Sequence, residues 1–166
     1  MNIPHIYNYL VRARRDLWAA LEATPDYVLS RPLLNGDLFH SIKDFVFHIA
    51  DVEDGWTNGD IRKTPFVQQN FPDLHNTPQG PNFHTFPLAR LLEYWRAVEQ
   101  NTLVWLPTLT PAELARIVED GKTVDGLLWH TMIHEIRHTA QIVTLLRMQD
   151  VKPPSLDLLF YLPIEP

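Results

Sequence analysis

Three histidines, His130, His134 and His138, recur at intervals of four residues in the last third of the chain. On an α-helix, residues four apart lie on one face about one turn apart, so two neighbouring imidazoles can bind a single ion. Apolar residues flank this row at helical period, and the histidines lie along the edge of their stripe (Leu127, Leu128, Ile142, Leu145 and Leu146). The spacing therefore predicts metal ligands that face the interior of a helical protein.

A third ligand candidate, His48, lies on an earlier helix, at the border of that helix's apolar stripe. Three imidazoles with an open fourth position are typical of catalytic divalent-metal sites, because water or substrate fills the vacancy. We therefore propose His48, His134 and His138 as the ligand set. Three successive imidazoles on one helix span about 12 Å along its axis. His130 is therefore expected to support the site from outside or to pack in the core.

The motif H-E-x-x-H over residues 134–138 also matches zinc proteases, in which the glutamate is the general base. The extended protease motif would require Gly at Gln141 and His at Thr144, and neither is present. A distant glutamate ligand has only Glu165 to offer, one residue from the C-terminus. The protease interpretation is therefore disfavoured, but Glu135 remains a candidate catalytic base.

The composition narrows the class of protein. A chain of 166 residues is expected to form a single domain, residues 1–166, with a sizeable core. The net charge of −6, without any Lys/Arg run, argues against a nucleic-acid partner. No apolar run approaches the roughly 18 residues of a membrane helix, and no signal-peptide pattern begins the chain, so we expect a cytoplasmic protein without membrane contact. With no cysteine, any metal must be held by histidine, carboxylate and water.

Helical periodicity predicts four long amphipathic helices and no strands, hence an all-α four-helix bundle. A short helix is expected after Thr110-Pro111, and the apolar tail 156–162 is expected to pack back on the bundle. Ser41 with Asp44 resembles a capping box, and Thr123 is expected to cap the last helix. A loop over 32–37 contains the turn signal Asn35-Gly36. The long helices are expected over 6–23, from 41 to Gly55 or Gly59, over 88–106, and over 123–148.

The segment 57–87, between the second and third long helices, contains five prolines and no sustained period. A connection this long is usually a lid, a binding loop or partly disordered. His75 and His84 lie in it and are expected to be exposed. Trp56 and Trp95 are candidate walls of a substrate pocket.

Three segments of the sequence resemble one protein family. The stretch from Ser41 to Trp56, the stretch 130–141 and the tail 157–162 resemble the DinB/YfiT-like superfamily of metal-binding proteins. The resemblance implies a four-helix bundle, frequent homodimers, and a divalent metal that is zinc, nickel or manganese. It also implies one ligand from the second helix and two from the fourth, which fall on His48, His134 and His138. One departure is Ala140, where related sequences often have glycine, so close helix packing at this position is in doubt.

Three functions stay open, of which the resemblance implies the first. Family members include a maleylpyruvate isomerase and S-transferases that use bacillithiol, mycothiol or glutathione; there the metal lowers the pKa of the thiol. A metal-dependent hydrolase with Glu135 or Glu53 as base is a second possibility. The simpler interpretation of these two glutamates is that both are surface residues. The third is a non-catalytic, stress-related metal-binding or dimerisation module.

Overall fold

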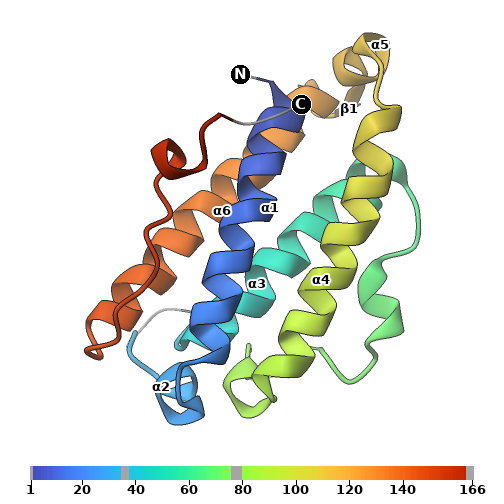
Figure 1. Ribbon diagram of the computed structural model, residues 1–166. Helices are drawn as coiled ribbons and strands as arrows, with labels where there is room; N and C mark the ends of the chain where they lie inside the picture. The colour runs from blue at the N-terminus through green and yellow to red at the C-terminus, as the bar shows by residue number, and fades with distance from the viewer. Residues whose placement is uncertain (1, 35–37, 76–79, 164–166) are drawn as a thin grey trace.

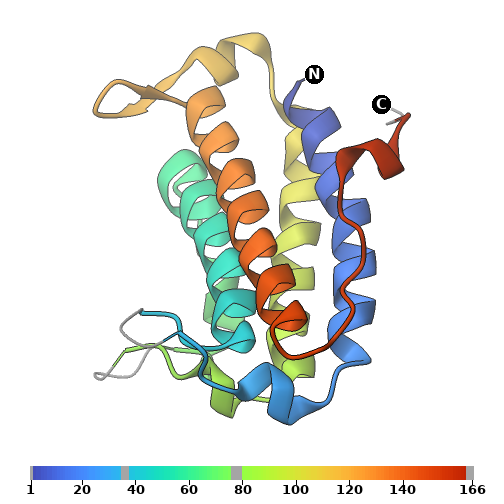
Figure 2. The ribbon, with the colours of Figure 1, turned by 90° about the vertical axis from the view of Figure 1, so that its left-hand side faces the viewer.

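The structure, a computed structural model, describes residues 2–34, 38–75 and 80–163. Four long helices pack side by side as a bundle (Figures 1 and 2), which confirms the predicted all-α four-helix fold. These helices are α1 (Ile3–Glu22), α3 (Ile42–Asp54), α4 (Leu88–Trp105) and α6 (Val124–Arg147). Two short helices, α2 (Asp26–Ser30) and α5 (Pro111–Ala115), lie at opposite ends of the bundle (Figure 1).

The order of the helices around the bundle brings α3 next to α6. The most extensive contacts between long helices join α3 with α4, α3 with α6, α1 with α6, and α1 with α4. In Figure 1, α1 and α6 run downward, whereas α3 and α4 both run upward. The helix with the predicted ligand His48 is therefore the antiparallel neighbour of the helix with His134 and His138.

The parallel direction of α3 and α4 explains the long proline-rich connection between them. After α3 the chain must return along the bundle before α4 can begin, and Figure 1 shows this return on the outside of the two helices. The chain first continues α3 as a π-helix, η1 (Gly55–Arg62). Phe66 then packs so closely on η1 that a Cβ on Gly59 would lie 2.6 Å from its ring. A side chain at position 59 would therefore require the ring of Phe66, which is 43% exposed, to move.

The rest of the return segment, expected to be a lid, a binding loop or partly disordered, is packed against the core in its described part. It contains two 3₁₀ turns, η2 (Val67–Asn70) and η3 (Phe83–Thr85). Four of its apolar side chains are buried in the core: Val67, Phe71, Leu74 and Phe83. Residues 76–79 of this segment, like the predicted Asn35-Gly36 turn, lie outside the described residues.

Local capping signals place the helix starts where the sequence predicts them. The Ser41 hydroxyl accepts from the Asp44 N–H, and the Asp44 carboxylate accepts from the Ser41 N–H, which completes a capping box at α3. The hydroxyl of Thr110 accepts from the N–H of Glu113 at the start of α5, and that of Thr123 caps α6 in the same way.

Two local features differ from the expected helix pattern. Helix α2 has five residues, which are too few to show a period, so the sequence does not predict it. The expected helix after Thr110 stops at Ala115, and a small antiparallel hairpin follows, with strands β1 (Ile117–Glu119) and β2 (Lys122–Thr123). Asp120 and Gly121 at its tip both have positive φ, 49° and 74°, as a tight hairpin turn requires.

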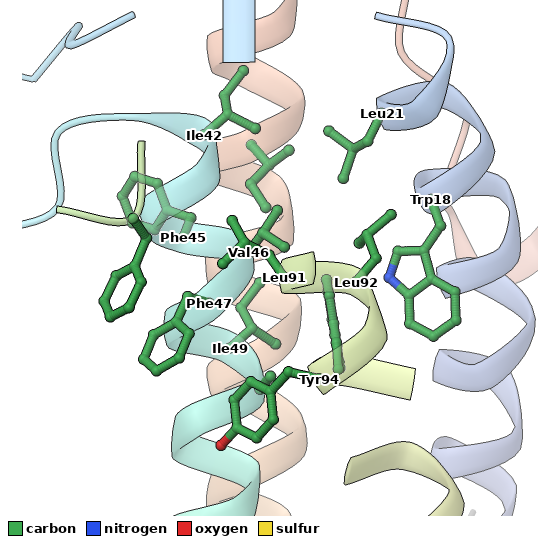
Figure 3. Close-up of a cluster of buried hydrophobic side chains, with 14 of the residues drawn as sticks. Trp18, Leu21, Ile42, Phe45, Val46, Phe47, Ile49, Leu91, Leu92 and Tyr94 are labelled. Atoms are coloured by element: carbon green, nitrogen blue, oxygen red, sulfur yellow. The ribbon is translucent and has the colours of Figure 1, made fainter. Parts of the chain in front are cut away.

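The buried apolar side chains form two clusters along the bundle axis. Figure 3 shows part of one, in which side chains of α1, α3 and α4 meet, including Trp18, Ile42 and Leu92. The other surrounds the start of α1 and the start of α6 and includes Tyr7, Leu10 and Leu128. A layer of buried charged residues lies between the two clusters. Each long helix contributes one residue to this layer: Arg14, Glu53, Glu99 and Glu135.

The C-terminal segment packs along α1, as predicted for the tail, but with only part of its apolar surface. Tyr161 is buried, its ring lies edge-on to Tyr9 at 5.5 Å, and its hydroxyl donates to Asp16 over 2.6 Å. Leu159 and Phe160, by contrast, are exposed. Among the described residues, no helix is long and apolar enough to cross a membrane.

Candidate metal centre

The interface of α3 and α6 brings together the three predicted ligands, His48, His134 and His138. One ring nitrogen of each lies within 4.8 Å of the others. The ring centroid of His48 lies 4.8 Å from that of His134 and 4.9 Å from that of His138. The ring centroids of the two α6 histidines are 4.2 Å apart. Nitrogens bound tetrahedrally to one zinc ion are roughly 3.3 Å apart, so small side-chain rotations would complete the site.

The group is open to solvent on one side. His138 is buried, whereas His48 and His134 are half-buried. Within the described part of the chain, no fourth histidine or carboxylate belongs to this group. Three protein ligands with an accessible side leave a coordination position for an exogenous molecule.

The surroundings of His48 and His134 keep these two imidazoles neutral at physiological pH. Burial, with smaller contributions from the neighbouring His138 and Arg137, lowers the pKa of His48 to about 4. Burial and the other histidines lower the pKa of His134 to about 3. A neutral imidazole offers a ring lone pair to a metal ion, so the donor set fits a divalent ion that prefers nitrogen ligands.

Gln141 orients His138, a role that the sequence analysis did not assign. The Nδ1 atom of His138 is hydrogen-bonded to Oε1 of Gln141, three residues further along α6. An amide oxygen can only accept, so Nδ1 carries the proton and Nε2 is the nitrogen available to a metal. The helical spacing of three was the signal that could have identified this pair.

Aromatic rings surround the histidines. Phe39 stacks on His48 with 4.0 Å between ring centroids, and Phe45 lies 5.4 Å from His138. A cavity of about 210 Å³ lies beside His48. Its lining consists of Leu38, Phe39, Phe47, His48, Asp51, Gly80, Pro81 and Phe83. A separate hollow of about 380 Å³ lies between α1, α6 and the C-terminal segment, and none of the three histidines lines it.

Three other histidines and two tryptophans that the sequence analysis named lie outside the triad. His130 is exposed and packs edge-on against Trp56 at 5.4 Å, so of its two expected places the core is wrong; its ring centroid lies 6.1 Å from that of His134, beside the triad. Trp95 is fully buried against Trp18, and it therefore cannot line an open pocket. His75 is exposed, as expected, but His84 is half-buried near Asp44.

Glu135 and Glu53 are buried, so the interpretation of both as surface residues is wrong. Arg14 donates from Nε to Oε1 of Glu135 over 2.8 Å and from Nη2 to Oε2 over 2.5 Å. Nη2 also donates to Glu53 over 2.6 Å, and the hydroxyl of Tyr7 donates to the other oxygen of Glu53. Burial raises the pKa of Glu135, and the Arg14 charge opposes this shift. Both glutamates belong to the charged layer inside the bundle, and a role of Glu135 as a base stays a prediction that this pairing disfavours.

Comparison with known proteins identifies the family of the chain. The sequence profile described as the DinB family matches residues 1–165, which include α3 and α6 with all three histidines. No curated protein matches the chain.

Proposed function

The chain belongs to the DinB family, and from that premise we propose that it is a divalent-metal-dependent enzyme that transfers a low-molecular-weight thiol to an electrophile. The observation that carries this proposal is a contrast between two sets of side chains. The three histidines form a group open to solvent. The two carboxylates that could act as bases, Glu53 and Glu135, are paired with Arg14 inside the bundle.

His48, His134 and His138 would hold the ion, and Gln141 would keep His138 in the orientation that binding requires. A divalent ion held there would supply a lower pKa for a bound thiol, and hence a thiolate nucleophile near neutral pH. The half-exposed positions of His48 and His134 let solvent reach the site and accept the thiol proton. The sulfur then forms a bond with the electrophilic carbon, and the leaving group departs with its bonding electrons. No protein base is needed.

The two alternative functions have weaker support. Metal-assisted hydrolysis calls for a base that activates water, and Arg14 occupies both oxygens of Glu135. A purely structural ion is typically enclosed by four protein ligands, whereas the described residues supply three. The open, three-ligand arrangement therefore favours an enzyme over a stress-related binding module.

The donor set favours particular metals. Imidazole nitrogens suit zinc and nickel, whereas manganese prefers oxygen ligands. We therefore propose zinc or nickel ahead of manganese. Bacillithiol, mycothiol and glutathione are the candidate thiols.

Metal analysis of the purified protein tests the site first. We expect one divalent ion per chain in the wild type and in His75→Ala, an exposed control outside the triad, and loss of the ion in His138→Ala. Gln141→Ala should retain the ligands but bind the ion about 10- to 100-fold more weakly. Equal metal content in wild type and His138→Ala would overturn the proposed site.

Thiol titration then tests the reaction. One of the three thiols should perturb the absorption spectrum of the cobalt-substituted protein and should be consumed with a model electrophile such as a chlorodinitrobenzene. A metal-loaded protein that responds to none of them would refute thiol transfer and leave hydrolysis or a structural ion.

Assembly and location complete the proposal. A homodimer in the cytoplasm accords with the family resemblance and with the use of cytosolic thiols. Sedimentation equilibrium measures the assembly, and a monomer at micromolar concentration would contradict it.

A further inference from the structure

Helix α3 has one strip of side chains that is not buried. Of its thirteen residues, only His48, Asp51 and Val52 lie on this strip. Asp51 follows the candidate ligand His48 by three residues, which places the two side chains on one face, about 5–6 Å apart at Cβ. The carboxylate of Asp51 therefore faces the same open region as the metal centre.

The cavity of about 210 Å³ beside His48 has aromatic walls and one charged side chain, Asp51. Phe47 and Phe83 stack with ring centroids 3.6 Å apart, and Phe39 covers the imidazole of His48. Among the residues that the structure describes, no lysine or arginine lines this cavity. Arg137 of α6, whose charge acts on His48 and His134, is exposed and lies outside the lining. The cavity thus combines aromatic side chains with a carboxylate.

The negative charge of this region is not offset by the protein. Asp54, one turn beyond Asp51, accepts hydrogen bonds only from neutral donors: Asn58 Nδ2, the N–H groups of Val67 and Gln68, and the hydroxyl of Tyr94. Among the described residues, neither Asp51 nor Asp54 forms an ion pair within 4.0 Å. The Asp51 carboxylate also has no hydrogen-bond partner in that part of the chain. A cationic group in the cavity would therefore meet this carboxylate without a competing cation from its described lining.

We propose that the thiol bound at this centre carries a protonated amine, which lies between the aromatic walls of the cavity and is recognised by Asp51. The inference rests on the proposed thiol chemistry and specifies the ligand class: an aminothiol with its sulfur toward the three histidines and its ammonium group toward Asp51. Ring faces attract organic cations, and a carboxylate at the same point adds an ion pair. Asp51 acts here as a specificity-determining residue.

A matched pair of small thiols tests this assignment. The probes are 3-aminopropanethiol and 3-mercapto-1-propanol, which differ by an ammonium group in place of a hydroxyl. Each is titrated into the cobalt-loaded protein, and the thiolate-to-cobalt absorption band reports binding. We expect the wild type to bind the aminothiol about tenfold more tightly than the alcohol.

Two variants separate local recognition from net charge. Asp51→Asn should lose the preference while it still binds the alcohol and one equivalent of cobalt. Asp60→Asn removes the same charge from an exposed position on η1, paired only with Lys63 at 3.9 Å, and should keep the preference. Asp51→Glu should restore part of it.

The outcomes distinguish this inference from the proposed function. Equal affinities of the wild type for the two thiols, or an unchanged preference in Asp51→Asn, would overturn the role of Asp51 and leave thiol binding intact. Cobalt bound without any thiol-dependent band would overturn both the thiol chemistry and this inference. Failure of the wild type to bind cobalt would overturn the centre itself.

Discussion

At the scale of single residues, neighbours in the sequence have opposite surroundings. His134 and Glu135 are adjacent, and successive side chains on a helix point about 100° apart. His134 therefore turns toward α3 and the open side of the bundle, whereas Glu135 turns inward to Arg14. The sequence contains the zinc-protease motif, but both carboxylate oxygens of its glutamate, Glu135, accept hydrogen bonds from Arg14.

The depressed histidine pKa values predict how the metal-free protein responds to acid. In the unfolded chain a histidine takes up a proton near pH 6.5, but His48 and His134 in the folded state do so only at about pH 4 and 3. Between these limits the unfolded state binds more protons, so the free energy of unfolding decreases as pH falls from about 6.5 to about 4. Urea unfolding of the metal-free protein at pH 7, 6 and 5 measures this dependence.

His134→Ala should flatten that pH dependence because the substituted side chain no longer titrates. His75→Ala, at an exposed position away from the triad, should keep the slope of the wild type. Parallel curves for the wild type and His134→Ala would show that the triad is not the source of acid sensitivity.

At the scale of elements, α3 has the strictest placement. It is buried on nearly all sides, its start is fixed by the Ser41–Asp44 capping box, and its last residue, Asp54, holds the return segment through the N–H groups of Val67 and Gln68. The π-helix η1 then carries the chain out of the bundle. These attachments at both ends fix the position of α3 along the bundle axis, and thereby the position of His48 relative to α6.

Removal of the α3 cap should therefore cost stability without removing a metal ligand. Ser41→Ala leaves an N–H donor without its acceptor in a buried position, and we expect a loss of about 1–2 kcal/mol in the free energy of unfolding. Thr110→Ala is the matched control, since it removes the same kind of cap from α5, which has no buried residues, and should cost less. Urea denaturation measures both, and equal losses would contradict the special position of α3.

At the scale of the whole molecule, the charged layer joins all four long helices. Arg14 of α1 contacts Glu53 of α3, Glu99 of α4 and Glu135 of α6, and its side chain is 1% exposed. Arg15, on the surface, adds a second cation to Glu99. Apolar contacts alone allow helices to shift along one another, whereas the ion pairs of Arg14 form only when the helices have one relative position. The layer thus favours one register of the bundle.

Loss of the central cation should be among the most damaging single substitutions. Arg14→Leu leaves three buried carboxylates without their common partner, and we expect a loss of at least about 3–5 kcal/mol in the free energy of unfolding. Arg90→Leu removes a half-buried arginine paired with the exposed carboxylates of Asp73 and Glu93, and a surface pair of this kind contributes about 1 kcal/mol or less. Thermal and urea unfolding compare the two variants. A similar small effect in both would show that the buried layer does not hold the helices together.

Much of the fold followed from short-range features of the chain. Helix starts at Ser41, Thr110 and Thr123 depend on hydrogen bonds within three residues, so the capping residues were readable directly. The long helices follow from apolar periodicity, and the proximity of His134 and His138 follows from the helical repeat. Local hydrogen bonding and helix geometry require no knowledge of the rest of the molecule.

Only the tertiary structure decided what lies opposite each side chain. His48 is 86 residues from His134 in the sequence, and the packing of α3 on α6 brings their rings to 4.8 Å. Glu53 and Glu135 are buried, because Arg14 on α1 supplies a charge that no local pattern announces. The return segment is packed because α3 and α4 run parallel, a property of helix order around the bundle. Burial and pairing depend on contacts between distant segments, so the chain order of residues leaves them undetermined.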